Sequence, residues 1–164
     1  MQRRPVIAIV GSGREVEPAV SNACELGRLV AENGWVLITG GRDAGVMKAA
    51  NVGAKQAKES LTIGILPDAD TDVSSAVDVA VVTDVGEARN NMIVLSADVV
   101  IACGVADPGT ASEVALAIKG GKSVILLGAD DASREFLRGI GGDIIRLANT
   151  PKEAIQVAGD IVGS

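Results

Sequence analysis

Short apolar segments of four to seven residues recur along the chain, separated by longer segments in which apolar side chains are three or four residues apart. A nearly continuous apolar run is typical of a strand that is buried on both faces of a parallel sheet. The pattern therefore predicts strands at Pro5–Val10, Trp35–Thr39, Leu61–Leu66, Val77–Thr83, Val99–Cys103, Ser123–Leu127 and Ile144–Leu147.

The intervening segments have the spacing of amphipathic helices. Helices are expected at roughly Val16–Asn33, Ala44–Lys58, Glu87–Ser96, Gly109–Lys119 and Ala132–Arg138, and in a final segment from Pro151. In the first of these, the predicted buried face carries Val16, Val20, Ala23, Gly27 and Val30. Thr150 precedes Pro151 and is expected to cap the last helix.

This alternation of strands and helices indicates the fold class. It predicts a single doubly wound α/β domain over residues 1–164, Rossmann-like, with a mainly parallel sheet flanked by helices. In such sheets, ligands bind beyond the carboxyl ends of the strands. Four glycine-containing loops lie at these ends, at Gly11–Gly13, Gly40–Gly45, Gly86–Asn90 and Gly104–Gly109, and we expect them to meet around one pocket.

Composition excludes several classes of function. The net charge is −6 and the only aromatic residues are Trp35 and Phe136, so neither a broad basic surface nor a stacking platform is available for nucleic acid. The chain lacks histidine, and Cys24 and Cys103 fall on different elements, so we expect neither a metal site nor a disulfide. The first apolar run is too short to span a membrane, and a cytoplasmic location is expected.

The clearest binding motif follows the strand at Val99–Cys103. Pro108-Gly109-Thr110 approaches a helix start, and Thr110 with Glu113 is interpreted as a capping box. Free backbone N–H groups and the positive end of a helix dipole attract phosphate. The sequence therefore predicts a pocket for a phosphorylated small molecule, with Gly109 and Thr110 at its edge.

The loops at Gly11–Gly13 and Gly40–Gly45 also place glycines at the end of a predicted strand. Gly11, Ser12 and Gly13 form either a ligand-contacting loop or a plain tight turn, and the third glycine of a dinucleotide fingerprint is absent. A nicotinamide dinucleotide is rejected because Thr39, not an acidic residue, ends the second strand. The predicted ligand-binding residues are Gly11, Ser12, Gly13, Gly40, Gly41, Gly45, Arg89, Gly109 and Thr110, although Gly45 also fits a role in close packing.

Arg89 and Glu113 are the candidate catalytic residues, should the protein be an enzyme. Arg89 lies early in a predicted helix, where a cation opposes the helix dipole, so its position favours a functional role. Its planar guanidinium can hold a phosphate or ribose hydroxyls. Glu113 is explained equally well by helix capping and by chemistry.

Taken together, these residues resemble a known family. The segments Gly40-Gly41…Gly45-Val46-Met47, Ala88-Arg89-Asn90 and Gly109-Thr110-Ala111-Ser112-Glu113 are similar to those of the Lonely-guy superfamily, and most of all to its molybdenum-cofactor carrier branch. The resemblance spans about Val6 to Leu127. Many members were labelled "lysine decarboxylase-like", but no lysine of this chain stands out for such chemistry.

The resemblance implies a nucleotide-binding Rossmann-like fold and homo-oligomers, usually dimers or tetramers. For the enzymatic branch it implies hydrolysis of a nucleoside 5′-monophosphate to free base and ribose 5-phosphate, with an arginine and a glutamate that match Arg89 and Glu113. The carrier branch binds the molybdenum cofactor, a pterin phosphate. Neither the enzymatic function nor the carrier function requires a further cofactor.

Two departures from the enzymatic pattern favour the carrier. Asn90 stands where the enzymes have lysine, and Asp107 lies in a loop where they have paired glycines. A carboxylate about 4 Å from a phosphate repels it by on the order of 4 kcal/mol at an effective dielectric of 20. Either Asp107 points away from the ligand, or this loop does not hold phosphate as the enzymes do. A member that has lost its ligand is the third reading.

Overall fold

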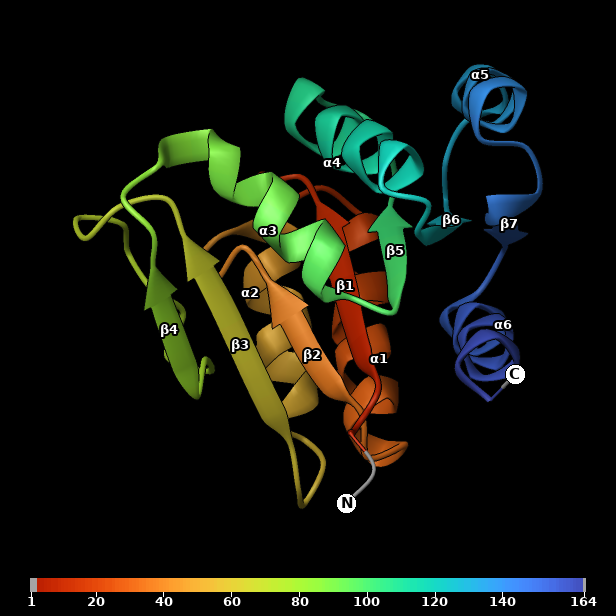
Figure 1. The fold of residues 1–164 in the computed structure, drawn as a ribbon. Helices are drawn as coiled ribbons and strands as arrows, with labels where there is room; N and C mark the ends of the chain where they lie inside the picture. Colours follow the sequence, from red (N-terminus) through yellow and green to blue (C-terminus); the bar gives the residue numbers. More distant parts are fainter. Residues whose placement is uncertain (1–2, 164) are drawn as a thin grey trace.

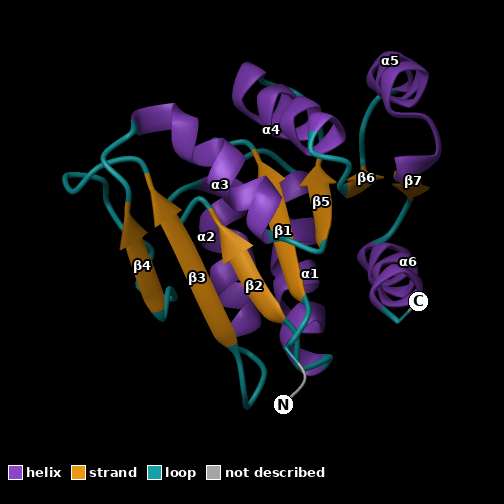
Figure 2. Cartoon of the chain, in the orientation of Figure 1, coloured by secondary structure: helices purple, strands orange, loops and turns teal. Residues whose placement is uncertain are grey.

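The computed structural model describes residues 3–163 and shows one parallel sheet of seven strands, in the order β4-β3-β2-β1-β5-β6-β7 (Figures 1 and 2). The strands are β1 (Val6–Gly11), β2 (Val36–Thr39), β3 (Leu61–Leu66), β4 (Val79–Val82), β5 (Val99–Cys103), β6 (Ser123–Leu127) and β7 (Ile145–Ala148). The strand order reverses direction at β1, which pairs with both β2 and β5. A crevice at such a switch point is the usual ligand site of this architecture.

Six helices cover the two faces of the sheet in the described residues (Figure 1). They are α1 (Ala19–Glu32), α2 (Gly45–Ala54), α3 (Arg89–Ser96), α4 (Pro108–Lys119), α5 (Asp131–Gly141) and α6 (Pro151–Val162), with 3₁₀ turns η1 (Gly86–Ala88) and η2 (Gly142–Ile144). Helices α1, α2 and α6 pack on one face, and α3, α4 and α5 on the other. The predicted fold class, a Rossmann-like α/β fold with a parallel sheet, is confirmed.

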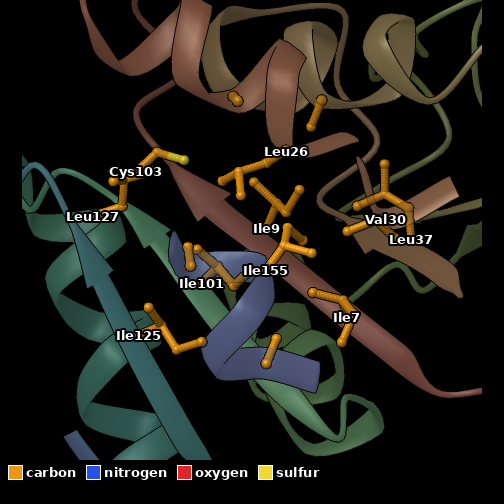
Figure 3. Packing of buried hydrophobic residues seen from close by; sticks show 14 of the residues in the cluster. Ile7, Ile9, Leu26, Val30, Leu37, Ile101, Cys103, Ile125, Leu127 and Ile155 are labelled. Atoms are coloured by element: carbon orange, nitrogen blue, oxygen red, sulfur yellow. The ribbon is translucent and has the colours of Figure 1, made fainter. Parts of the chain in front are cut away.

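Alternate residues of the central strands point into two separate cores. In β1, Ile7 and Ile9 pack with α1, α2 and α6, whereas Ala8 and Val10 pack with α3 and α4. Figure 3 shows the first of these cores, with Leu26 and Ile155 facing the strands. Burial on both faces explains why the sequence of these strands is apolar without alternation.

The two helices α1 and α2 cross with backbone against backbone. A Cβ atom added at Gly27 would overlap the carbonyl oxygen of Ala50, and one added at Gly53 would overlap that of Cys24. Glycine at both positions is what allows the helices to approach so closely. The contact brings α2, and with it the loop after β2, against the first βα unit.

Strand β4 lies at one edge of the sheet and, unlike β7 at the other edge, has no buried residue. It is shorter than the predicted Val77–Thr83, and Val79, Val81 and Val82 are each more than two-fifths exposed. Its sequence is as apolar as that of a central strand, so the apolar run predicted the strand but not its exposure.

Several helix boundaries also differ from the expectation. Helix α1 begins at Ala19, not Val16, because Pro18 disfavours the helical conformation in the residue before it, Glu17. Val16 is therefore 51% exposed and not part of the buried face, which includes Leu26 instead. The expected cap of α6 is present, with Thr150 Oγ1 accepting a hydrogen bond from the Glu153 amide at 3.2 Å.

Trp35 lies at the opposite end of the sheet from the switch-point crevice. It directly precedes β2, is half-buried, and its indole ring approaches Gly159 of α6. In the described part of the chain, no helix is both long and apolar enough to cross a membrane.

The α1–α2 contact generates a prediction on stability. Gly27→Ala should lower the free energy of unfolding by about 2–3 kcal/mol, because the new methyl group meets a backbone carbonyl that cannot rotate away. Gly139→Ala in α5 is the matched control, since a Cβ there has nothing within 4 Å. It should stabilise the protein by roughly 0.5 kcal/mol through helix propensity. Urea denaturation measures the free energy of unfolding of both variants. Equal effects of the two substitutions would contradict a special requirement for glycine at the α1–α2 contact.

Candidate functional site

The candidate site is a cavity of about 110 Å³ at the carboxyl ends of β1 and β2, next to the first turns of α3 and α4. All four of the glycine-containing loops that follow strand ends contribute to it. It is lined by Ile9, Val10, Gly11, Gly13, Gly40, Arg42, Met47, Glu87, Arg89, Asn90, Asp107, Gly109, Thr110 and Glu113. The position is the one that the topology of the sheet predicts.

Arg89 is the central group of this cavity. It is the first residue of α3 and only 3% exposed, yet its side chain makes no hydrogen bond or ion pair with any residue in the range 3–163. Gly40 makes room for it, because a Cβ at that position would lie 2.5 Å from Nη1 of Arg89 and 2.6 Å from the Met47 sulfur. An unpartnered buried guanidinium is a strong attractor for an anion.

The charges around Arg89 are mixed. Burial and, to a smaller extent, the charge of Arg42 lower the pKa of Arg89. The charges of Glu87 and Glu113 raise it. An arginine side chain nevertheless keeps its proton in proteins. Neither glutamate forms a direct ion pair with the guanidinium, which leaves its N–H donors available.

Glu113 lies inside α4 and is 7% exposed. Burial raises the pKa of Glu113 to about 8, with the charges of Asp107 and Glu87 adding to this effect and Arg89 opposing it. At neutral pH the carboxyl group is therefore mostly protonated, and it can donate a hydrogen bond to an anion.

The cap of α4 corrects the sequence-based interpretation. Asp107, not Thr110, is the N-cap: its Oδ1 accepts from the Thr110 amide at 3.1 Å and its Oδ2 accepts from the Thr110 hydroxyl at 2.9 Å. The expected capping box of Thr110 and Glu113 is wrong, because Pro108 occupies the first helical position. Capping therefore does not explain the burial of Glu113.

Asp107 itself follows neither of the two expected alternatives completely. Its carboxylate is turned onto the start of α4, where two hydrogen bonds hold it, but the residue still belongs to the cavity wall. A negative group thus shares the site with Arg89.

Sequence reasoning did not identify Arg42 and Glu87 as site residues. Arg42 follows the glycine pair after β2, where an antiparallel bridge to Val73 holds its backbone. Glu87 Oε2 accepts a long hydrogen bond of 3.4 Å from Nδ2 of Asn90, whose buried Oδ1 has no partner among the described residues. Arg42 was visible in the motif as a cation beside the glycines, but nothing in the spacing indicated Glu87.

Three of the predicted ligand-binding residues lie outside the cavity wall. Ser12 lines a neighbouring cleft, and its carbonyl oxygen accepts from the Val46 amide at 3.0 Å. A Cβ at Gly41 would lie 2.8 Å from the Cα of Gly64, and one at Gly45 would overlap the carbonyl oxygen of Ser12. With φ angles of +72° and +48°, these two glycines serve turn geometry and close packing.

The arrangement is suited to an oxyanion. Arg89 offers unpaired N–H donors, Glu113 offers a proton, and the start of α4 adds the positive end of a helix dipole. Among residues 3–163, no group of three or more histidine, cysteine, aspartate or glutamate side chains is placed to hold a metal ion.

Comparison with known proteins agrees with this architecture. Residues 4–155 match the model of the SLOG cluster4 family. A protein of Archaeoglobus fulgidus, described only as uncharacterized, is 42% identical over 150 residues, which cover 92% of this chain and 91% of the relative.

Two solved structures are similar over nearly the whole chain. The molybdenum cofactor binding protein from the phototrophic bacterium Rippkaea orientalis is 48% identical, with a TM-score of 0.93 over 99% of each chain. The molybdenum cofactor carrier protein of Chlamydomonas reinhardtii is 40% identical, with a TM-score of 0.92 over 98% of this chain and 100% of that one.

The environment of Glu113 predicts a pH dependence of stability. Its pKa in the folded protein is about 8, above the ordinary 4.5, so the folded state binds this proton more tightly than the unfolded state. The resulting stabilisation is complete below pH 4.5 and is lost as the pH rises to about 8. Relative to Glu113→Gln, the wild-type protein should lose about 1.4 kcal/mol per pH unit across this window. Urea denaturation of both proteins at a series of pH values tests this, and a pH-independent difference would be evidence against it.

Proposed function

The chain belongs to the SLOG cluster4 family, and from this premise we propose that it binds the molybdenum cofactor, a pterin phosphate, and carries it without chemical turnover. Two similar structures are of proteins described as binding or carrying this cofactor. The observation that carries the proposal is the buried Arg89 guanidinium, which has no partner within residues 3–163 and faces a cavity at the switch point of the sheet.

The cavity suits the phosphate end of such a ligand. Its volume of about 110 Å³ is well below that of pockets that enclose a whole drug-sized ligand, roughly 300–1,000 Å³. We infer that only the phosphate enters, with Arg89 pairing with it and the protonated Glu113 carboxyl donating to it. The pterin then extends outward, towards the adjoining cleft of about 190 Å³ that shares Asp107 with the cavity.

Hydrolysis of a nucleoside 5′-monophosphate is the second candidate. The observation in its favour is that Arg89 and Glu113, the residues that match the enzymatic pattern, line the same cavity. Such a reaction needs a negative carboxylate near an oxocarbenium-like sugar. The raised pKa of Glu113 keeps this group mostly neutral at pH 7, so Glu113 does not supply that negative charge.

The binding proposal is tested with molybdenum cofactor released from a molybdoenzyme in the absence of air. After gel filtration, the wild-type protein should retain molybdenum and pterin in equal amounts. Arg89→Ala should weaken retention by about ten- to a hundredfold, the worth of a hydrogen-bonded charge pair. Arg138→Ala, which removes an exposed arginine of α5, is the matched control and should behave as wild type. Equal retention by Arg89→Ala and wild type would refute the assignment.

The enzymatic alternative is tested in parallel. Wild-type protein is incubated with a panel of nucleoside 5′-monophosphates, and free base is measured by chromatography. We expect no release above the level of Glu113→Gln. Release by the wild type that disappears in Glu113→Gln would replace the carrier function with hydrolysis.

A further inference from the structure

Two helices of this chain begin with the same side-chain arrangement. At the start of α4, Asp107 accepts from the amide of Thr110 at 3.1 Å and from its hydroxyl at 2.9 Å. At the start of α5, Asp130 accepts from the amide of Ser133 at 2.8 Å and from its hydroxyl at 3.1 Å. The two carboxylates therefore cap their helices in the same way.

Their surroundings differ completely. Asp130 is exposed, whereas Asp107 is partly buried and belongs to the wall of the Arg89 cavity. The charge of Asp107 also reaches Glu113, whose pKa it helps to raise. One cap therefore lies on the surface, while the other is a negative group inside a site whose buried cation lacks a partner in the described residues.

The N–H and O–H groups that donate to Asp107 are the groups to which an anion would bind. A phosphate at a helix start binds the free amides of the first turn and the adjacent hydroxyl groups. At α4, the amide and the hydroxyl of Thr110 are already bonded to the Asp107 carboxylate. Asp107 makes no ion pair with Arg89 in residues 3–163, so the carboxylate competes for the helix start and leaves the guanidinium open.

We propose that Asp107 is an internal competitor of the ligand's phosphate: it occupies the amide and hydroxyl of Thr110, repels the incoming anion, and so sets a weak, readily reversed affinity. This inference rests on the proposed function, because it assumes that a phosphate binds beside Arg89. A ligand must displace the carboxylate from Thr110 or bind through Arg89 and Glu113 alone. In either case, dissociation is faster than from an uncapped helix start.

Two substitutions separate the charge of Asp107 from its occupancy of Thr110. Asp107→Asn removes the charge but keeps a good cap. Asp107→Gly removes both, and frees the amide and the hydroxyl. Asp130→Asn and Asp130→Gly are the matched controls, because they make the same two changes at a helix start that does not line the cavity.

The experiment measures binding of inorganic phosphate by calorimetry and the dissociation rate of molybdenum cofactor for all five proteins. We expect Asp107→Gly to bind phosphate roughly tenfold more tightly than wild type and to release the cofactor correspondingly more slowly. Asp107→Asn should be intermediate, and the Asp130 variants should match wild type. The two glycine variants should lose similar amounts of thermal stability, which shows that the gain in affinity does not come from capping.

The outcomes distinguish this inference from the proposed function. Binding of cofactor by the wild type, with no gain in either Asp107 variant, overturns the inference and leaves the carrier function standing. An equal gain in the Asp130 variants also overturns it. Binding of neither phosphate nor cofactor by any of the five proteins overturns both.

Discussion

The structure depends on one positive charge that is kept almost entirely out of water. Transfer of an unpaired guanidinium from water into the protein is costly, and here no direct ion pair within the described residues offsets the cost. The charge of Glu87 offsets part of it, without an ion pair that would occupy the N–H donors. Gly40 then follows as a requirement, since a Cβ at this position would lie 2.5 Å from Nη1 of Arg89.

The same charge explains the chemistry of its neighbours. Glu113 is buried beside a cation and still holds its proton at neutral pH, because desolvation outweighs the attraction of Arg89. The site is therefore a balance of two arginines against carboxyl groups, one of which is neutral. On the proposed function, this balance allows an anion both to bind and to be released.

Much of the fold could be predicted from the sequence, and the errors have physical causes. Strands such as Val99–Cys103 were predicted with the observed bounds because burial on both faces leaves an uninterrupted apolar run. A proline at the first helical position identified Thr150 as the cap of α6, and the same rule applies to Pro108 in α4. The Thr110–Glu113 spacing, however, predicted a different cap, which the structure does not contain. Sheet topology predicted where the loops converge, whereas the direction of side chains such as Glu87 depends on tertiary packing that no spacing encodes.

The position of Trp35 makes the protein convenient to study. It is the sole tryptophan and the chain has no tyrosine, so its emission dominates the intrinsic fluorescence. The indole ring lies against α6, at the amino-terminal end of β2, on the far side of the sheet from Arg89. Its signal reports the docking of α6 and global unfolding. Unfolding of the wild type and of the variants proposed above can thus be followed by fluorescence without an added label.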